Sequence, residues 1–483
     1  MAYRKFIQPA LFMLTCLAMA ISATGQQQGP FNYIVVENQA IITGLDPAYS
    51  GEVVIPETLG GYPVVGIGNS AFANRYGVTS VMMPNTVVWI GNYAFHSCLN
   101  ITNFSLPNSL KTVGRGAFEG TGIQQVRIPS SVTNLGANAF FGCWNLQNVT
   151  LEDGLIGIGD MAFAWCRMLQ TITLPDSVMT VGEQAFGFSG LTNVSIGKGL
   201  TSLGQGAFVG CPNLLAVNVA AGNANYYSSE GVLFSRNPVV LLQYPVGRAG
   251  AYAVPVGVTG IGPTAFSGAY QLTSIHLPFG LTGIGESAFC ECTNLTSLLI
   301  PDTVTWLGER AFEWCFGLTN VVIGNGVTNI GSRAFLSCIG LKRVVVGKNV
   351  TTIGDYAFVY CTTLERVYFL GNAPTTVGQQ IFSSADGVTV YYLPNKSGWG
   401  PTFAERPTRL WNPLFTGIRP EGPEIRLRIS GTPNIPIALE VSTNIACAHW
   451  LHQVTTNLAA GQIELLTKLP TGAQAAFWRI VGP

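Results

Sequence analysis

One short pattern dominates the sequence: a glycine stands four residues before the phenylalanine of an Ala-Phe pair. The pair recurs every 22 to 24 residues, apart from one interval of 58 residues between Phe208 and Phe266, and it ends as Ile381-Phe382. A fixed period of this length predicts a solenoid, in which each repeat is one coil that buries its apolar face only against its neighbours. The phenylalanines are Phe72, Phe95, Phe118, Phe140, Phe163, Phe186, Phe208, Phe266, Phe289, Phe312, Phe335, Phe358 and Phe382.

A well-kept repeat, residues 295–315, shows how one coil is expected to form. Apolar residues alternate over 295–300, as in a short strand with one buried face, and Pro301 ends the strand because proline lacks a donor for the next ladder bond. A second apolar pair follows, and Gly308 then allows a tight bend, either where a side chain would collide or where φ must be positive. We expect Phe312 to lie on one short helical turn and its ring to fill the hydrophobic core of the coil.

Cysteine usage follows the same repeat. Of the eleven cysteines, eight lie three residues after a repeat phenylalanine, where other repeats have Arg75, Thr121, Ser189 or Ala269, which are mostly small residues. A position that accepts Cys, Thr, Ser or Ala predicts a small buried slot filled by a free thiol. Stacked coils would also bring neighbouring cysteines to about 5 Å, so bridges such as 143–166 or 315–338 stay open as an alternative. The eight are Cys98, Cys143, Cys166, Cys211, Cys292, Cys315, Cys338 and Cys361.

The N-terminus has the features of an export signal. Arg4 and Lys5 precede an apolar stretch over residues 10–21, and small residues around Ala20 and Ala23 offer cleavage sites. This stretch is too short to span a membrane, and no other segment reaches that length without interruption. We therefore predict a signal peptide over residues 1–23, with the mature protein secreted or held at the cell surface and without a transmembrane span.

Composition and motifs argue against an enzyme or a nucleic-acid-binding protein. The formal net charge is zero and only 10% of residues are charged, so no basic stripe is available for nucleic acid. His449 and His452 have a spacing that can bind zinc, but no cluster of further ligands accompanies them. The glycines of 157–162 imitate a dinucleotide fingerprint, yet they are the bends of the repeat itself. We predict no catalytic residue, no metal and no cofactor.

The repeat unit resembles the BspA-like leucine-rich repeats of bacterial and protozoan surface proteins. The resemblance covers about residues 31–411 and rests on the strand leucines, the Pro, Val-Thr, Ile-Gly, Ala-Phe and Cys positions. It implies a leucine-rich repeat solenoid of parallel β-strands with short helical turns, dominated by β-structure. Residues 226–245 look like the hairpin insertion of this family, which accounts for the long interval as one coil plus about 35 residues.

The resulting domain plan places three parts after the predicted signal peptide. Residues 31–66 are expected to form an N-terminal capping hairpin and the first strand, followed by the solenoid over 67–413 with a β-hairpin insertion at about 220–254. Beyond residue 413 the period is lost, and strict alternation over 425–429 and 437–441 is typical of half-exposed strands. We predict a small all-β sandwich module over residues 414–483.

The outward positions of the predicted strands are the best candidates for binding. In the first half of the array these positions are polar and mostly uncharged, whereas in the second half they become apolar and basic. A solvated face without a partner is the simplest interpretation, but arginine and aromatic residues side by side also anchor interfaces. We predict contacts with extracellular or cell-surface proteins through Arg343, Val345, Arg366 and Tyr368, with His276 and Arg127 as further candidates.

Two alternatives to protein binding and adhesion remain. Trp89 and Trp306 precede inward residues and should point outward, while Trp144, Trp165 and Trp314 follow the repeat phenylalanine. Exposed indole rings can stack on sugars, which would make the protein a polysaccharide-binding surface protein, although packing against neighbouring coils is the simpler role. A structural component of the cell envelope is the second alternative.

Overall fold

A computed structural model describes residues 25–421, 424–433, 435–442, 451–458, 460–468 and 477–481, and the predicted signal peptide lies outside them. Over these ranges the chain forms strands and turns without a helix, so none of it contains a helix that could cross a membrane. The chain divides into two compact units. The first runs to Tyr252 and includes Gly257–Thr273 and Ile284–Thr293, and the second comprises Ala253–Val256, Ser274–Gly283 and everything from Asn294.

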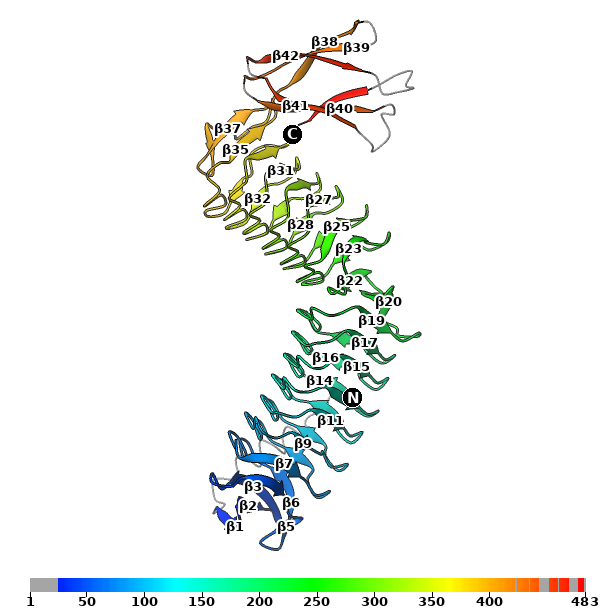
Figure 1. The fold of residues 1–483 in the computed structure, drawn as a ribbon, viewed down its shortest axis with the longest axis vertical. Helices are drawn as coiled ribbons and strands as arrows, with labels where there is room; N and C mark the ends of the chain where they lie inside the picture. Colours follow the sequence, from blue (N-terminus) through cyan, green and yellow to red (C-terminus); the bar gives the residue numbers. More distant parts are fainter. Residues whose placement is uncertain are drawn as a thin grey trace, which may run out of the picture. The chain divides into compact units, whose positions relative to one another are not determined.

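The first unit starts with an antiparallel hairpin that feeds into a parallel ladder. Strand β2 (Phe31–Val36) pairs with β1 (Gln26–Gln28) and β3 (Gln39–Leu45), and β3 pairs in parallel with β6 (Tyr62–Ile67), which also pairs with β5 (Thr58–Leu59). The ladder then continues through one two-residue strand per coil (Figure 1). These are β8 (Trp89–Ile90), β10 (Thr112–Val113), β12 (Asn134–Leu135), β14 (Gly157–Ile158), β16 (Thr180–Val181) and β18 (Ser202–Leu203).

A second row of parallel strands carries the alternating leucines, and we call its outer surface the strand face. In the first unit this row is divided into the groups β4-β7-β9, β11-β13 and β15-β17-β19. Its strands are β4 (Gly51–Val54), β7 (Val78–Met82), β9 (Asn103–Phe104), β11 (Gln125–Ile128), β13 (Asn148–Leu151), β15 (Thr171–Leu174), β17 (Asn193–Ile196) and β19 (Ala216–Val219).

The second unit repeats both rows. Its strand face runs in the order β27, β29, β31, β33, β35, β37, and the short β36 pairs antiparallel with β37. These are β27 (Ser297–Ile300), β29 (Asn320–Ile323), β31 (Arg343–Val346), β33 (Arg366–Phe369), β35 (Thr389–Tyr392), β36 (Thr402–Phe403) and β37 (Arg406–Leu410). The other row holds β28 (Trp306–Leu307), β30 (Asn329–Ile330), β32 (Thr352–Ile353) and β34 (Thr376–Val377). Near the division of the units lie β23 (Gly250–Ala253), β25 (Leu272–His276) and β26 (Gly283–Ile284).

The repeat phenylalanines form a stacked column in each unit, as the period predicts. Adjacent ring centroids are 4.9 to 5.7 Å apart from Phe72 to Phe208, and 5.2 to 5.6 Å apart from Phe312 to Phe382. The rings are almost wholly withdrawn from solvent. The solenoid architecture of the leucine-rich repeat type is therefore confirmed.

The predicted helical turn around each phenylalanine is wrong. Arg310 and Trp314, two residues before and two after Phe312, have φ of 54° and 61°, in the left-handed region. The N–H of Phe312 donates to the carbonyl of Ala334 in the next coil at 2.8 Å. A helix would direct its N–H groups along its own axis, whereas this alternation directs every second one to the neighbouring coil and so continues the ladder.

In most repeats, close backbone contact requires the glycine that precedes the Ala-Phe pair. A β-carbon at Gly114 would lie 2.6 Å from the carbonyl carbon of Gly91 and 2.7 Å from the backbone nitrogen of Asn92. Such distances are shorter than real β-carbons adopt, so the coils could not stack at this spacing with any other residue there. The predicted collision is confirmed.

The cysteine slot is small, buried and lined by a carbonyl. The nine described cysteines are buried thiols that form no disulfide with one another, while Cys16 and Cys447 lie outside the described residues. The Cys143 thiol donates to the carbonyl of Phe118 at 3.1 Å, and Cys338 makes the same bond to Phe312 at 3.2 Å. Where the sequence has Thr121, its hydroxyl occupies the slot and donates to the Phe118 carbonyl of its own coil at 2.9 Å.

The long interval of the repeat contains a hairpin and one atypical coil. Strands β20 (Tyr226–Ser229) and β21 (Val232–Ser235) pair antiparallel, β22 (Val240–Gln243) returns beside β21, and β24 (Gly260–Ile261) resumes the parallel ladder. Tyr244 takes the place of the missing phenylalanine. Its ring stacks on Phe266 at 4.8 Å and its N–H donates to Ala265 at 2.8 Å. The coil period is thus kept across the insertion.

The C-terminal module consists of two three-stranded antiparallel sheets, ordered β38-β39-β42 and β41-β40-β43. Their strands are β38 (Leu414–Glu421), β39 (Glu424–Ser430), β40 (Pro436–Ser442), β41 (Leu451–Asn457), β42 (Gln462–Lys468) and β43 (Phe477–Val481). Alternate residues of β39 and β40, such as Leu427, Ile429 and Leu439, are fully buried. The predicted all-β module is therefore present, while His449 and Trp450 lie outside the described residues.

Candidate binding surface

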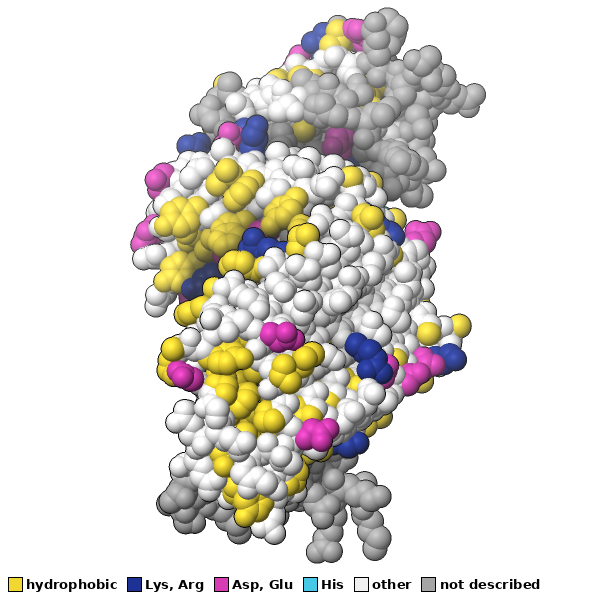
Figure 2. Space-filling view, turned by 60° about the horizontal axis from the view of Figure 1, so that its bottom comes forward, with side chains coloured by type: hydrophobic (Ala, Val, Ile, Leu, Met, Phe, Trp, Pro, Cys, Tyr) yellow, Lys and Arg dark blue, Asp and Glu magenta, His cyan; other side chains and the backbone are white. Residues whose placement is uncertain are grey.

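Outward side chains on the strand face of the first unit form regular polar columns. In β11, β15 and β17 inward residues are buried and outward residues exposed in strict alternation. The parallel register places each outward residue beside its counterpart in the next coil, as Gln125 lies beside Asn148. Figure 2 shows charged side chains of both signs scattered over the face that it presents, without a continuous stripe of one sign. The columns contain Gln125, Arg127, Asn148, Thr150, Thr171, Thr173, Asn193 and Ser195.

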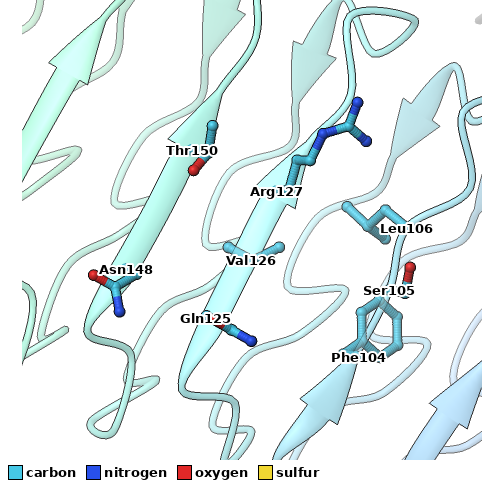
Figure 3. Close-up of a pocket in the computed structure, with 8 residues that line it drawn as sticks. All are labelled: Phe104, Ser105, Leu106, Gln125, Val126, Arg127, Asn148 and Thr150. Carbon is cyan, nitrogen blue, oxygen red and sulfur yellow. The ribbon is translucent and has the colours of Figure 1, made fainter.

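A cavity of about 310 Å³ opens on this face where β9 and β11 belong to different sheets. Figure 3 shows Phe104 and Leu106 on one side of it and Gln125 and Arg127 on the other. Phe104 occupies the inward position that a smaller residue fills in other coils. Its ring makes edge contacts with Phe95 at 5.5 Å and Phe118 at 4.5 Å. The cavity therefore lies at the step between this large ring and the smaller inward Val126 of the next coil.

Arg127, a predicted partner-binding residue, is exposed and fixed at the edge of this cavity. Its Nε donates to Glu152 at 2.7 Å and its Nη1 donates to Asn108 at 3.0 Å. The other oxygen of Glu152 accepts the backbone N–H of Ser130 at 3.0 Å, so the carboxylate is also held in place. The guanidinium is therefore presented in a defined position, which reduces the entropy lost when a partner binds.

The four residues predicted as a patch in the second unit are brought together. Arg343 lies beside Arg366, and Val345 lies beside Tyr368, in the register of β31 and β33. Tyr368, however, is only 4% exposed, because it packs in one cluster with Leu427 and other residues of the C-terminal module. The chain itself therefore covers part of this patch, and a role of the patch in partner binding stays a prediction.

Aromatic contacts and burial set the electrostatics of this covered region. The Arg343 guanidinium lies 5.4 Å from the centre of the Tyr368 ring, which stacks on Tyr391 at 5.0 Å. Burial lowers the pKa of Arg343 and raises the pKa of Tyr368, since both charged forms lose hydration. The Trp411 indole N–H donates to the carbonyl of Pro436 at 3.0 Å and so links the last coil to the module.

His276 and the tryptophans take different positions. His276 is exposed at the end of β25, three repeats before Val345, and it is not part of the Arg343 patch. The rings of Trp89 and Trp306 lie over Gly66 and Gly283 of the preceding coils, so they pack against neighbours, although Trp306 is still 46% exposed as its predicted outward position requires.

Trp144 and Trp165 border a small aromatic surface. Trp144 is 63% exposed, and the guanidinium of Arg167 lies 6.0 Å from its ring and 5.1 Å from that of Trp165. Trp165 in turn stacks on Phe188 at 4.8 Å. Trp314 is also exposed. Across the described ranges, no group of three or more histidine, cysteine or acidic residues is placed to hold a metal ion.

Comparisons with known proteins agree with this architecture. The family model described as BspA type leucine rich repeat region (6 copies) matches residues 65–155, 133–234 and 259–389. A leucine rich cell surface protein from Faecalibacterium prausnitzii is 26% identical with a TM-score of 0.58, covering 78% of this chain and 96% of its own. No curated protein sequence matches the chain.

Two further solved structures share the fold. The pneumococcal vaccine antigen PcpA is 21% identical with a TM-score of 0.63, and the match covers 77% of this chain and 94% of that chain. A leucine-rich repeat protein from Eubacterium ventriosum is 21% identical with a TM-score of 0.57, covering 76% and 90% of the two chains. At these identities the likeness concerns the fold alone.

Proposed function

Because the chain belongs to the BspA-type leucine-rich repeat family, we propose that it is an exported, non-enzymatic scaffold that binds extracellular or cell-surface proteins through its strand face. The observation that carries this proposal is the exposed polar surface of β11, β13, β15 and β17, together with the cavity beside Arg127. Adhesion to other cells or to matrix is the role that such binding would serve. A location at the cell surface or outside the cell is supported by the family and by the name of the F. prausnitzii protein.

The strand face suits protein recognition for a geometric reason. Successive coils place equivalent side chains about 4.8 Å apart, so the surface is a grid of amides, hydroxyls and one fixed guanidinium. Interfaces of standard size need about 800 Å² on each partner, which a flat face extending over several coils can offer. Carboxamides both donate and accept hydrogen bonds, so Gln125 and Asn148 could pair with backbone or side-chain groups of a partner.

Binding of the full chain to matrix proteins or whole cells tests the proposal. We expect the variant with Gln125→Ala, Arg127→Ala and Asn148→Ala to lose at least about tenfold in affinity, since each removes hydrogen bonds at the interface. A matched control carries Lys111→Ala, Asn134→Ala and Thr180→Ala, which change residues on or beside the row of two-residue strands, and should bind like the wild type. Equal affinity of both variants would contradict the proposal. His276, Arg343, Val345, Arg366 and Tyr368 form the second set to be substituted in the same assay.

Recognition of a polysaccharide is a second candidate, favoured by the exposure of Trp144 beside Arg167. An exposed indole offers a flat apolar surface for the faces of sugar rings. A glycan array with the full chain, repeated with Trp144→Ala, separates this candidate from protein binding. Signals that vanish with Trp144→Ala support it, and signals that are insensitive to the substitution remove this residue from consideration.

A further inference from the structure

A second cavity, of about 230 Å³, lies where the C-terminal module meets the last coils. Arg343, Val345, Tyr368, Tyr391 and Trp411 line it from the solenoid side, and Ile480 of β43 lines it from the module. We propose that this cavity binds a small aromatic carboxylate, with the guanidinium of Arg343 as the anchor for the carboxylate and the aromatic side chains as walls for the ring. This site shares Arg343, Val345 and Tyr368 with the second set of strand-face residues named above, but it does not depend on the polar surface around Arg127.

The first argument is the unbalanced charge of Arg343. Its Nε is withdrawn from solvent and has no hydrogen-bond partner. Among the described residues, no carboxylate lies within ion-pair distance of its guanidinium. The nearby Glu440 already binds Arg479 at 2.6 Å. A half-buried cation without a direct counter-ion costs stability, and an anion entering the cavity would remove that cost.

Two polar side chains of the cavity, those of Arg343 and Tyr368, can donate hydrogen bonds to a ligand. The buried hydroxyl of Tyr368 has no partner, and burial keeps it protonated because it raises the pKa of the phenol. The guanidinium has five N–H donors and no acceptor. The indole N–H of Trp411 is already used by Pro436. A ligand with acceptor oxygens and negative charge therefore fits this wall, whereas a cation or an amine does not.

The remaining lining is aromatic and aliphatic. The Tyr368 ring lies between the stacked ring of Tyr391 at 5.0 Å and the edge contact of Trp411 at 5.8 Å. Val345 and Ile480 add aliphatic surface, and Phe369, Leu370, Tyr392 and Leu393 also line the cavity. Such walls favour a flat apolar body, and the volume admits one ring system but not a folded peptide segment. The combination specifies the ligand class as an aryl or indolyl carboxylate.

Calorimetric titration of the full chain with indole-3-acetate, and separately with the neutral indole-3-acetamide, tests the proposal. We expect the carboxylate to bind at least about tenfold more tightly than the amide, because only the carboxylate forms charge-assisted bonds to the guanidinium. This comparison needs no substitution, so it stays decisive if a variant fails to fold. Equal affinities, or no binding of either compound at about 10 mM, would overturn the proposal.

Three variants locate the site. Arg343→Gln should abolish the preference for the carboxylate, whereas Arg366→Gln, the matched change one coil away in the same register, should retain it. Val345→Phe narrows the cavity without altering its charge, so it should lower the affinity for both compounds by a similar factor. A preference that survives in Arg343→Gln would show that the carboxylate binds elsewhere and would overturn the assignment.

Discussion

The strand faces of the two units share one backbone plan but differ in what their outward columns carry. In the first unit, outward residues such as Thr171 and Asn193 are polar and exposed. In the second unit, one outward column is apolar, and its exposure falls from 64% at Leu299 and 37% at Val322 to 4% at Tyr368. The decrease runs along the chain toward the C-terminal module. At the C-terminal end of the apolar column the same chain supplies a cover, whereas the polar columns of the first unit remain open to solvent.

This contrast separates two tasks that a single repeat performs. The inward positions, the glycine and the Ala-Phe turn fix the stacking of coils and are nearly invariant across both units. The outward positions are free of that constraint and determine what each segment contacts. Comparing substitutions of the same kind in the two units therefore measures the shared core and the divergent faces independently.

The largest effect should come from the phenylalanine column, and it should be equal in both units. Phe163→Ala and Phe335→Ala each remove a fully buried ring stacked between two others, and each should lower the free energy of unfolding by about 3–5 kcal/mol. Urea unfolding followed by circular dichroism measures the loss. Phe163→Leu and Phe335→Leu serve as controls that retain most of the volume. A large loss of unfolding free energy in only one unit would contradict the inference that the two units have equivalent cores.

The next effect concerns the cover of the second unit. Leu427 is fully buried in the cluster that joins the module to Tyr368 and Tyr391, so Leu427→Ala should cost about 2–4 kcal/mol. Leu299→Ala makes the same chemical change at a side chain that is 64% exposed, and it should stay within about 0.5 kcal/mol of the wild type. Thermal unfolding of both variants gives the comparison. Similar losses for the two would mean that the module does not pack on this face.

Much of this architecture could be predicted from the sequence because the period repeats the same physical requirement in every coil. The buried column, the small cysteine slot and the collision at glycine all follow from it. The Ala-Phe turn was predicted incorrectly, because residues such as Tyr93 and Trp314 adopt positive φ and carry no glycine signal, although Gly116 and Asn138 at equivalent positions hint at it. The ladder to the next coil, not local propensity, determines that conformation.

The binding surface was harder to predict than the core. The position of Arg127 on an outward column follows from strand alternation, and its cavity could have been inferred from Phe104, a large ring where other coils have a smaller inward residue. The burial of Tyr368 could not have been inferred from the sequence. Its contacts come from the module, which does not follow the repeat. Contacts between the periodic solenoid and the non-periodic module produce no regular spacing of residues, so no sequence pattern predicts them.

The cysteine slot gives a pH-dependent effect of intermediate size. Burial raises the pKa of Cys143 from 9.0 to about 11. Since the folded-state pKa lies above the unfolded value, the stability from this thiol is complete below pH 9 and is lost as the pH rises toward 11. At pH 10 the contribution of this thiol to the free energy of unfolding should be about 1.4 kcal/mol lower than at pH 7.

Comparing the wild type with Cys143→Ser isolates this one thiol, because the serine hydroxyl does not titrate. The difference in unfolding free energy between the two proteins should change by that amount between pH 7 and pH 10. Cys361 of the second unit, with a pKa raised to about 12, should behave in the same direction. Rapid alkylation of either thiol in the folded protein at pH 8 would contradict its burial.

The smallest effect on stability should come from the ion pair at the open face. Glu152→Gln removes the charged partner of Arg127 but keeps an oxygen that can accept its hydrogen bond. Because the Arg127 side chain is 51% exposed, the free energy of unfolding should fall by less than about 1 kcal/mol, and by less still at high salt. The same substitution leaves the guanidinium less firmly held, so its effect on partner binding should exceed its effect on stability. Chemical unfolding at low and high salt, set beside binding of the same variant, measures both. A stability loss of several kcal/mol would mean that Arg127 and Glu152 belong to the structural framework of the coil. Arg127 would then no longer be the best-defined candidate for partner binding on the open face.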